Sequence, residues 1–192
     1  MVQNIRHAYC STKRGRISSP YRIRSYPQPA SPAAGVSFAD IFPPMNLRLR
    51  GTLVRGHRVA SRPSKDYPYS ALKKQMPFFK TRGLDLYRYF NGTLNISIAP
   101  LTFAMSAPQF TFELIEWTDL HPPETFSFSR CKVIFKDVEY PGWVYYPHPE
   151  TKRNHFQNPS LIEAITHEIP AIRYGEALDV EVDEREITVS GG

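Results

Sequence analysis

Alternating apolar and polar residues recur from Asn46 onward and predict a chain built mainly of β-strands. The first such segment is NLRLRGTLV, residues 46–54, and Gly56 follows its end. Alternation with period two is typical of a strand that buries one face. The pattern returns in GTLNISI, QFTFELIEWT, TFSFSRCKVIFKDV, GWVYYPH and ALDVEVDEREITVS, which Pro, Gly, Asp or Asn residues separate. The last of these predicts one strand or a hairpin.

Two further segments predict short helices. In ALKKQMPFFK, residues 71–80, Ser70 is a suitable N-cap and Gly83 a suitable terminator, while Pro77 is expected to limit the regular part. In PSLIEAITHEI, residues 159–169, Pro159 stands at an early helical position.

Five to seven short strands with two helices favour a closed or nearly closed β-barrel over a parallel α/β sheet. The length of 192 residues and a hydrophobic content of 41% fit one domain, which we place at residues 45–192. Aromatic side chains in the strands are expected to fill the barrel or to support the helices: Phe110, Phe112, Phe126, Phe128, Phe135, Trp143 and Tyr145.

Residues 1–44 differ from the rest, because they are rich in Ser, Pro, Tyr and Arg and have little hydrophobic periodicity. This composition predicts a flexible basic tail. Three interpretations remain open: a leader resembling an organelle transit peptide, an upstream extension before a start at Met45, or an arm that binds RNA or a partner.

Charge is distributed unevenly along the chain. Residues 1–50 hold eight basic residues and one acidic residue, and residues 51–100 hold nine and two. The remaining residues hold seven basic and fifteen acidic residues. A basic front of this kind attracts polyanions, and charge alone favours nucleotides and nucleic acids equally.

Cysteine and hydropathy patterns exclude several classes of protein. Cys10 and Cys131 are far apart, which argues against a disulfide scaffold or a four-cysteine zinc site, and the six histidines show no zinc-site spacing. The sequence contains no stretch of about 18 apolar residues and no secretory signal at its start. We therefore expect a cytoplasmic protein without a membrane partner, with organelle import left open by the tail.

The segment FNGTLNISI, residues 90–98, carries the most specific chemistry. Thr93 and Asn95 are two residues apart, so in a strand they share one face while Leu94 and Ile96 share the other. Hydroxyl and amide oxygens suit Mg²⁺, which retains water and substrate phosphates in its coordination shell. The alternative is ordinary turn chemistry at the start of a strand.

The order of segments resembles the archaeal-type, CTP-dependent riboflavin kinases over about residues 46–187. The matching features are the strand GTLVRG at 51–56, the helix ending in Pro77-Phe78-Phe79, and the GTLN motif at 92–95. Later come KVI at 132–134, GWV at 142–144, PET at 149–151, LIEAI at 161–165 and YGE at 174–176.

The resemblance implies a six-stranded riboflavin-kinase-like barrel and phosphoryl transfer from CTP, or another nucleoside triphosphate, to the 5′-hydroxyl of riboflavin, which yields FMN. It implies that Thr93 and Asn95 hold Mg²⁺ and that Glu163 is the catalytic residue and a flavin contact. Thr151 or His155 would be a further flavin contact. The nucleobase contacts would fall near His167, Glu168, Ile169 and Pro170.

One segment departs from the family. Its nucleotide loop is usually rich in glycine, whereas here Gly56 is followed by a basic stretch without a second glycine. The candidate nucleotide contacts here are Gly56, His57, Arg58, Ser61, Arg62 and Lys65, of which Arg58, Arg62 and Lys65 are suited to phosphate oxygens. They either replace the backbone donors or form an ordinary solvated loop.

Three functions follow in order of preference. The first is a nucleotide-dependent riboflavin kinase that acts as a monomer on riboflavin and nucleotide. The second is a catalytically silent barrel that binds flavin or nucleotide. The third is a nucleic-acid-binding β-barrel, against which the chain lacks an RNP-type strand, a helix-turn-helix and a zinc finger.

Overall fold

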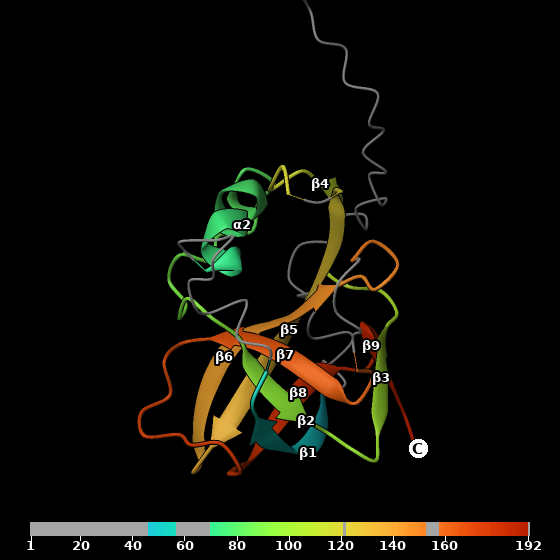
Figure 1. Ribbon diagram of the computed structural model, residues 1–192. Coiled ribbons are helices and arrows are strands. Elements are labelled where there is room, and N and C mark those ends of the chain that lie inside the picture. Colours follow the sequence, from blue (N-terminus) through green and yellow to red (C-terminus); the bar gives the residue numbers. More distant parts are fainter. Residues whose placement is uncertain (1–45, 57–69, 121, 153–157, 192) are drawn as a thin grey trace, which may run out of the picture. The chain divides into compact units, whose positions relative to one another are not determined.

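The computed structural model describes residues 46–56, 70–120, 122–152 and 158–191 (Figure 1). The predicted tail and the basic segment at 57–69 lie outside these residues. The described elements follow in chain order: β1 (Asn46–Val54), α2 (Ala71–Lys80), β2 (Leu94–Ser97), β3 (Thr102–Met105), β4 (Phe110–Ile115), β5 (Glu124–Phe135), β6 (Val138–Pro147), β7 (Leu161–Thr166), β8 (Ala177–Asp183) and β9 (Ile187–Ser190).

Six antiparallel strands close into a barrel in the order β1, β2, β7, β6, β5 and β8, and β8 pairs with both β5 and β1. Closure leaves these six strands without an unpaired edge. Strand β4 pairs with the beginning of β5, and β3 pairs with β9 in a separate two-stranded sheet. The predicted six-stranded β-barrel is confirmed.

The interior of the barrel is filled by the alternate side chains that the period-two pattern marked as apolar. Leu53 and Ile96 are opposite one another across β1 and β2, and both are buried in this core. Ile162 and Ala164 of β7 and Val180 of β8 join them and are fully buried. The intervening side chains therefore point to the outside of the barrel.

A second core lies outside the barrel, where apolar side chains of α2 pack together with side chains of β4, β5, β6 and β7. Phe79 of α2 is fully buried, and its ring lies 4.9 Å from Phe128 and 5.3 Å from Phe126 in edge-on arrangements. Phe135 belongs to the barrel core instead. The strand aromatics thus support the helix more than they fill the barrel.

Helix α2 begins and ends as its sequence predicts. The side chain of Ser70 accepts a hydrogen bond of 3.2 Å from the amide of Lys73, which is an N-cap interaction. Gly83 has a φ of 99°, a conformation that glycine adopts without strain, and the helix ends before it. Pro77 does not shorten the helix, which continues to Lys80, because the Pro77 carbonyl still accepts from Thr81.

The second predicted helix is wrong. Residues 161–166 form strand β7, which pairs with β2 and β6, and Glu163 is therefore a strand residue. Both faces of β7 carry apolar residues: Ile162 belongs to the barrel core and Ile165 to the core beneath α2. A strand buried on both faces reads as a continuous apolar run and has no period-two signature.

Candidate functional site

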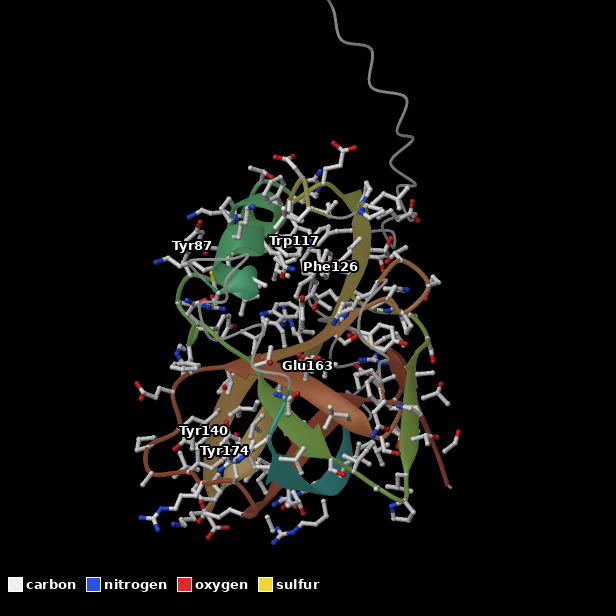
Figure 2. The ribbon with its side chains drawn as sticks, viewed as in Figure 1. Tyr87, Trp117, Phe126, Tyr140, Glu163 and Tyr174 are labelled. Atoms are coloured by element: carbon white, nitrogen blue, oxygen red, sulfur yellow. The ribbon has the colours of Figure 1, made fainter. Side chains whose placement is uncertain are left out.

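The candidate site lies on the outer face of the barrel, where β1, β2 and β7 run side by side. Asn95 is the central residue of one row across these strands, since it pairs with Val54 on β1 and with Glu163 on β7. Glu163 lies between the barrel and α2 (Figure 2). Its neighbours Ile162 and Ala164 point into the barrel core, which fixes Glu163 on the outside.

Thr93 joins this row through a hydrogen bond. Its hydroxyl donates to Oε2 of Glu163 over 3.1 Å, and both side chains are half-buried. Thr93, Asn95 and Glu163 therefore converge on one side of the sheet, as strand alternation predicted for the first two. Leu94 packs against the opposite, barrel-core side.

Gly56 approaches the same group from the end of β1. A Cβ atom placed on Gly56 would lie 2.4 Å from the side-chain nitrogen of Asn95 and 2.5 Å from its oxygen. Real Cβ atoms do not come this close, so any side chain here would displace the Asn95 amide. The absence of a side chain at Gly56 lets the amide keep its position.

Two side chains of this group offer oxygen atoms of the kind that Mg²⁺ prefers. The Thr93 hydroxyl directs its hydrogen toward Glu163 and keeps its oxygen lone pairs for a cation. The Asn95 amide oxygen is the second such atom. Within the described ranges, no cluster of three or more His, Cys, Asp and Glu side chains could hold a metal ion.

Tyr145 and Gln75 close the side of the site toward α2. The buried Tyr145 hydroxyl donates to Oε1 of Gln75 over 3.0 Å, and Gln75 is 2% exposed. Burial, and then the charges of Glu163 and Glu124, raise the pKa of Tyr145 well above its usual value. Tyr145 is therefore a neutral phenol near the Glu163 carboxylate. The sequence analysis assigned neither Tyr145 nor Gln75 to the site.

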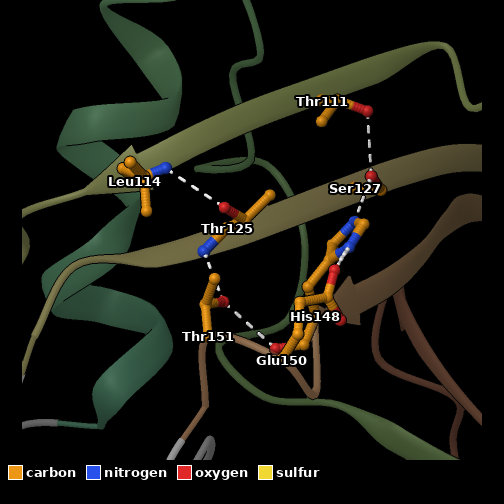
Figure 3. A network of polar contacts seen from close by, with 7 residues as sticks. All are labelled: Thr111, Leu114, Thr125, Ser127, His148, Glu150 and Thr151. Carbon is orange, nitrogen blue, oxygen red and sulfur yellow. Dashed lines mark hydrogen bonds and ion pairs between the residues drawn. The ribbon is translucent and has the colours of Figure 1, made fainter.

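Thr151, one of the two predicted flavin contacts, holds a turn. Its hydroxyl accepts from the amide of Thr125 over 2.9 Å and donates to the carbonyl of His148 over 3.1 Å (Figure 3). Its hydroxyl thus binds backbone at the start of β5 and in the turn after β6.

The predicted nucleobase contacts divide into two groups. His167 is exposed, and its ring lies 5.1 Å from Tyr89, near the GTLN motif. Glu168 and Pro170 are also exposed. Ile169 is buried in the barrel core, so only its backbone remains for a ligand.

Six predicted ligand contacts lie outside the described residues: His57, Arg58, Ser61, Arg62, Lys65 and His155. The described residues that flank the basic segment are Gly56, which adjoins Asn95, and Ser70, whose hydroxyl donates to the Asn91 side chain over 2.9 Å. Gly56 and Ser70, the two described residues that flank this segment, therefore both lie close to the GTLN motif.

A chain of polar contacts that the sequence analysis missed links Glu150, His148 and Ser127 (Figure 3). His148 lies 2.8 Å from Glu150 through Nδ1 and 2.8 Å from Ser127 through Nε2. Acid, imidazole and hydroxyl stand in the order used by serine hydrolases. Ser127, however, is fully buried and bonds Thr111 over 2.9 Å, so no substrate reaches its hydroxyl. The chain of contacts joins β4, β5 and the turn after β6.

In the part of the chain that the structure describes, no helix has the length and apolar character needed to cross a membrane. No protein-family model matches the sequence, and no curated protein matches it.

Proposed function

We propose that the protein is a phosphotransferase that uses a nucleoside triphosphate, CTP in the first instance, and Mg²⁺ to phosphorylate riboflavin to FMN. The observation that carries the proposal is the convergence of Thr93, Asn95 and Glu163 on one outer face of the barrel. The resemblance of the GTLN and LIEAI segments to the riboflavin kinases suggested these three residues from separate parts of the sequence.

Thr93 and Asn95 would hold Mg²⁺ through their side-chain oxygens. A bound Mg²⁺ ion neutralises charge on the phosphates during transfer. The residues of the chain supply position: Gly56 leaves room for the Asn95 amide, and the Glu163 carboxylate orients the Thr93 hydroxyl.

Glu163 is the residue suited to the acceptor hydroxyl. As a carboxylate it would accept a hydrogen bond from the ribityl hydroxyl of riboflavin and take its proton as the oxygen attacks the γ-phosphorus. The bond from this phosphorus to the β,γ-bridging oxygen breaks, and the nucleoside diphosphate leaves. Tyr145 does not compete as a proton acceptor, because its phenol is neutral and its proton is directed to Gln75. Arg58, Arg62 and Lys65 are proposed to bind the phosphates in place of a glycine-rich loop.

A catalytically silent flavin- or nucleotide-binding barrel is the second candidate. It is favoured by the hydrogen bond between Thr93 and Glu163, because this bond occupies an oxygen of the carboxylate that is proposed as the base. Binding of the same ligands without turnover would distinguish this candidate from the kinase.

Two measurements on the full-length protein test the proposal. Riboflavin fluorescence is titrated with and without Mg-CTP, and FMN formation is followed by chromatography with CTP and ATP in parallel. Quenching together with FMN formation that Glu163→Gln abolishes supports the kinase. Quenching without FMN supports the silent barrel, and no response to flavin or nucleotide rejects both.

A further inference from the structure

A groove of about 610 Å³ lies between residues 83–88 and the outer faces of β4, β5 and β6. The residues that give it chemical character are Tyr87, Arg88, Gln109, Phe110, Arg130 and Trp143. Thr93, Asn95 and Glu163 do not line it. Its volume is within the range of about 300–1,000 Å³ that is usual for small-molecule sites.

Aromatic rings form the apolar part of the groove. Phe110 and Trp143 meet edge to face with their ring centres 5.6 Å apart. Tyr87, beside α2 in Figure 2, is 52% exposed, and the ammonium group of Lys80 lies 5.0 Å from its ring centre. Exposed aromatic surface next to rigidly packed rings is suited to stacking against a flat ring.

Two arginines supply the positive charge. The guanidinium of Arg130 lies 5.7 Å from the ring centre of Trp143, and that of Arg88 lies 5.1 Å from the ring centre of Tyr89. Arg88 also donates to the Tyr89 hydroxyl over 3.1 Å. Aromatic neighbours thus hold both side chains in place while most of their donors remain available.

The carboxylates near the groove leave these arginines without a close partner. Asp85, which lines the groove, pairs with Lys80 over 2.9 Å and accepts from the Tyr87 amide over 3.0 Å. Burial raises the pKa of the half-buried Glu186, and the positive charge of Arg130 acts in the opposite direction. Among the described residues, neither Arg88 nor Arg130 forms an ion pair with a carboxylate within 4.0 Å.

From this arrangement we infer a second ligand site, independent of the proposed kinase function. Its ligand is a small molecule that carries both a flat aromatic ring and a phosphate group, such as a nucleoside monophosphate. The ring packs against the exposed aromatic surface, and the phosphate accepts hydrogen bonds from Arg88 and Arg130. Gln109 adds a neutral group able to donate to or accept from the edge of the ring.

The experiment uses fluorescence anisotropy of etheno-AMP with the full-length protein in EDTA. Asn95→Ala protein is titrated in parallel, so that failure of the Mg²⁺ site cannot be mistaken for failure of the groove. Arg88→Gln and Arg130→Gln remove one charge each, and Arg173→Gln is the control, since it removes an exposed arginine outside the groove. Thermal melts verify that each variant is folded.

We expect saturable binding of etheno-AMP that Arg88→Gln and Arg130→Gln each weaken about tenfold or more. The loss of one hydrogen bond between charged groups lowers the affinity by at least this factor. The Arg173→Gln and Asn95→Ala proteins should bind etheno-AMP with the affinity of the parent. The parent should bind etheno-adenosine about as weakly as the Arg88→Gln and Arg130→Gln proteins bind etheno-AMP.

Several results would overturn the inference. These are no saturable binding, equal affinity for etheno-AMP and etheno-adenosine, or arginine variants that bind like the parent. A short single-stranded oligonucleotide that binds a hundredfold more tightly through the same arginines would identify a nucleic-acid surface instead.

Discussion

The hydroxyl of Thr93 donates a hydrogen bond to the carboxylate of Glu163, which lies 70 residues further along the chain. The two residues belong to adjacent segments of the barrel, since Asn95 pairs directly with Glu163 between β2 and β7. The GTLN motif thus obtains a carboxylate from strand pairing, through Thr93 immediately before β2 and Asn95 within it. Strand pairing holds such groups more rigidly than loops do, and phosphoryl transfer depends chiefly on their position.

Replacing Asn95 should separate ligand binding from stability. Asn95 is half-buried on the outer face, so Asn95→Ala should remain folded but lose binding of Mg-nucleotide. Ile96 is fully buried in the barrel core, so Ile96→Ala should lower the free energy of unfolding by about 2–5 kcal/mol through the cavity it leaves. Urea titrations and nucleotide calorimetry measure the two effects. Normal Mg-nucleotide binding by Asn95→Ala would remove the metal assignment and, with it, the kinase proposal.

Gly56→Ala tests whether the approach to Asn95 matters. The new methyl group would overlap the Asn95 amide, which must move, so Mg-nucleotide affinity should fall at least tenfold. Gly191→Ala is the matched control, because a Cβ there has no neighbour within 4 Å. Equal affinities in the two variants would show that the Asn95 amide plays no part in binding.

The basic segment after Gly56 should bind phosphate. Replacing Arg58, Arg62 and Lys65 together with Ala should weaken nucleotide binding far more than flavin binding, since each charge-assisted contact contributes about 1.5–3 kcal/mol. Parallel titrations with CTP and riboflavin provide the comparison. Unchanged CTP affinity would indicate that these residues form only a solvated surface.

Local sequence patterns predicted most of the fold because most strands have one buried face. β1 and α2 match their predicted segments, residues 46–54 and 71–80. Strand β7 was mistaken for a helix because both of its faces are covered, by the barrel core and by α2. Strand β3 gave no distinct pattern, since its four residues are stabilised by pairing with the distant β9.

The site was predictable where neighbouring residues define it. Strand alternation places Thr93 and Asn95 on one face, whereas their proposed role as metal ligands and the role of Glu163 were suggested by the family resemblance. The contacts of Gln75 with Tyr145 and of Ser127 with His148 join residues far apart in sequence. The packing of α2 brings the first pair together, and the register of β5 against β6 brings the second pair together. No local signal in the sequence therefore reveals these contacts.

Tyr145→Phe should destabilise the protein through the partner it leaves behind. Removing the phenol oxygen strips Gln75 Oε1 of its hydrogen bond in a site that is 2% exposed, at a cost of about 1–3 kcal/mol. The melting temperature should fall by about 2–4 °C per kcal/mol. Tyr145→Phe combined with Gln75→Leu should cost less than the sum of the two single changes. Additive costs would mean that the hydrogen bond contributes nothing to stability.

Cys131 should make stability depend on alkaline pH. Burial raises the pKa of its thiol from 9.0 to about 12, so the unfolded chain loses this proton at a lower pH than the folded protein does. The stabilising contribution of the neutral thiol is therefore complete below pH 9 and is lost progressively as the pH rises toward 12. The loss is about 1.4 kcal/mol per pH unit, or about 4 kcal/mol over the whole interval. Cys131→Ala removes this titration but leaves Tyr145, whose raised pKa acts in the same direction in both proteins. Urea titrations at a series of pH values should therefore show the stability advantage of the parent over Cys131→Ala shrinking above pH 9. If the difference between the two proteins stays constant from pH 8 to 11, the thiol ionises alike in the folded and unfolded states, and its burial in the barrel core is incomplete.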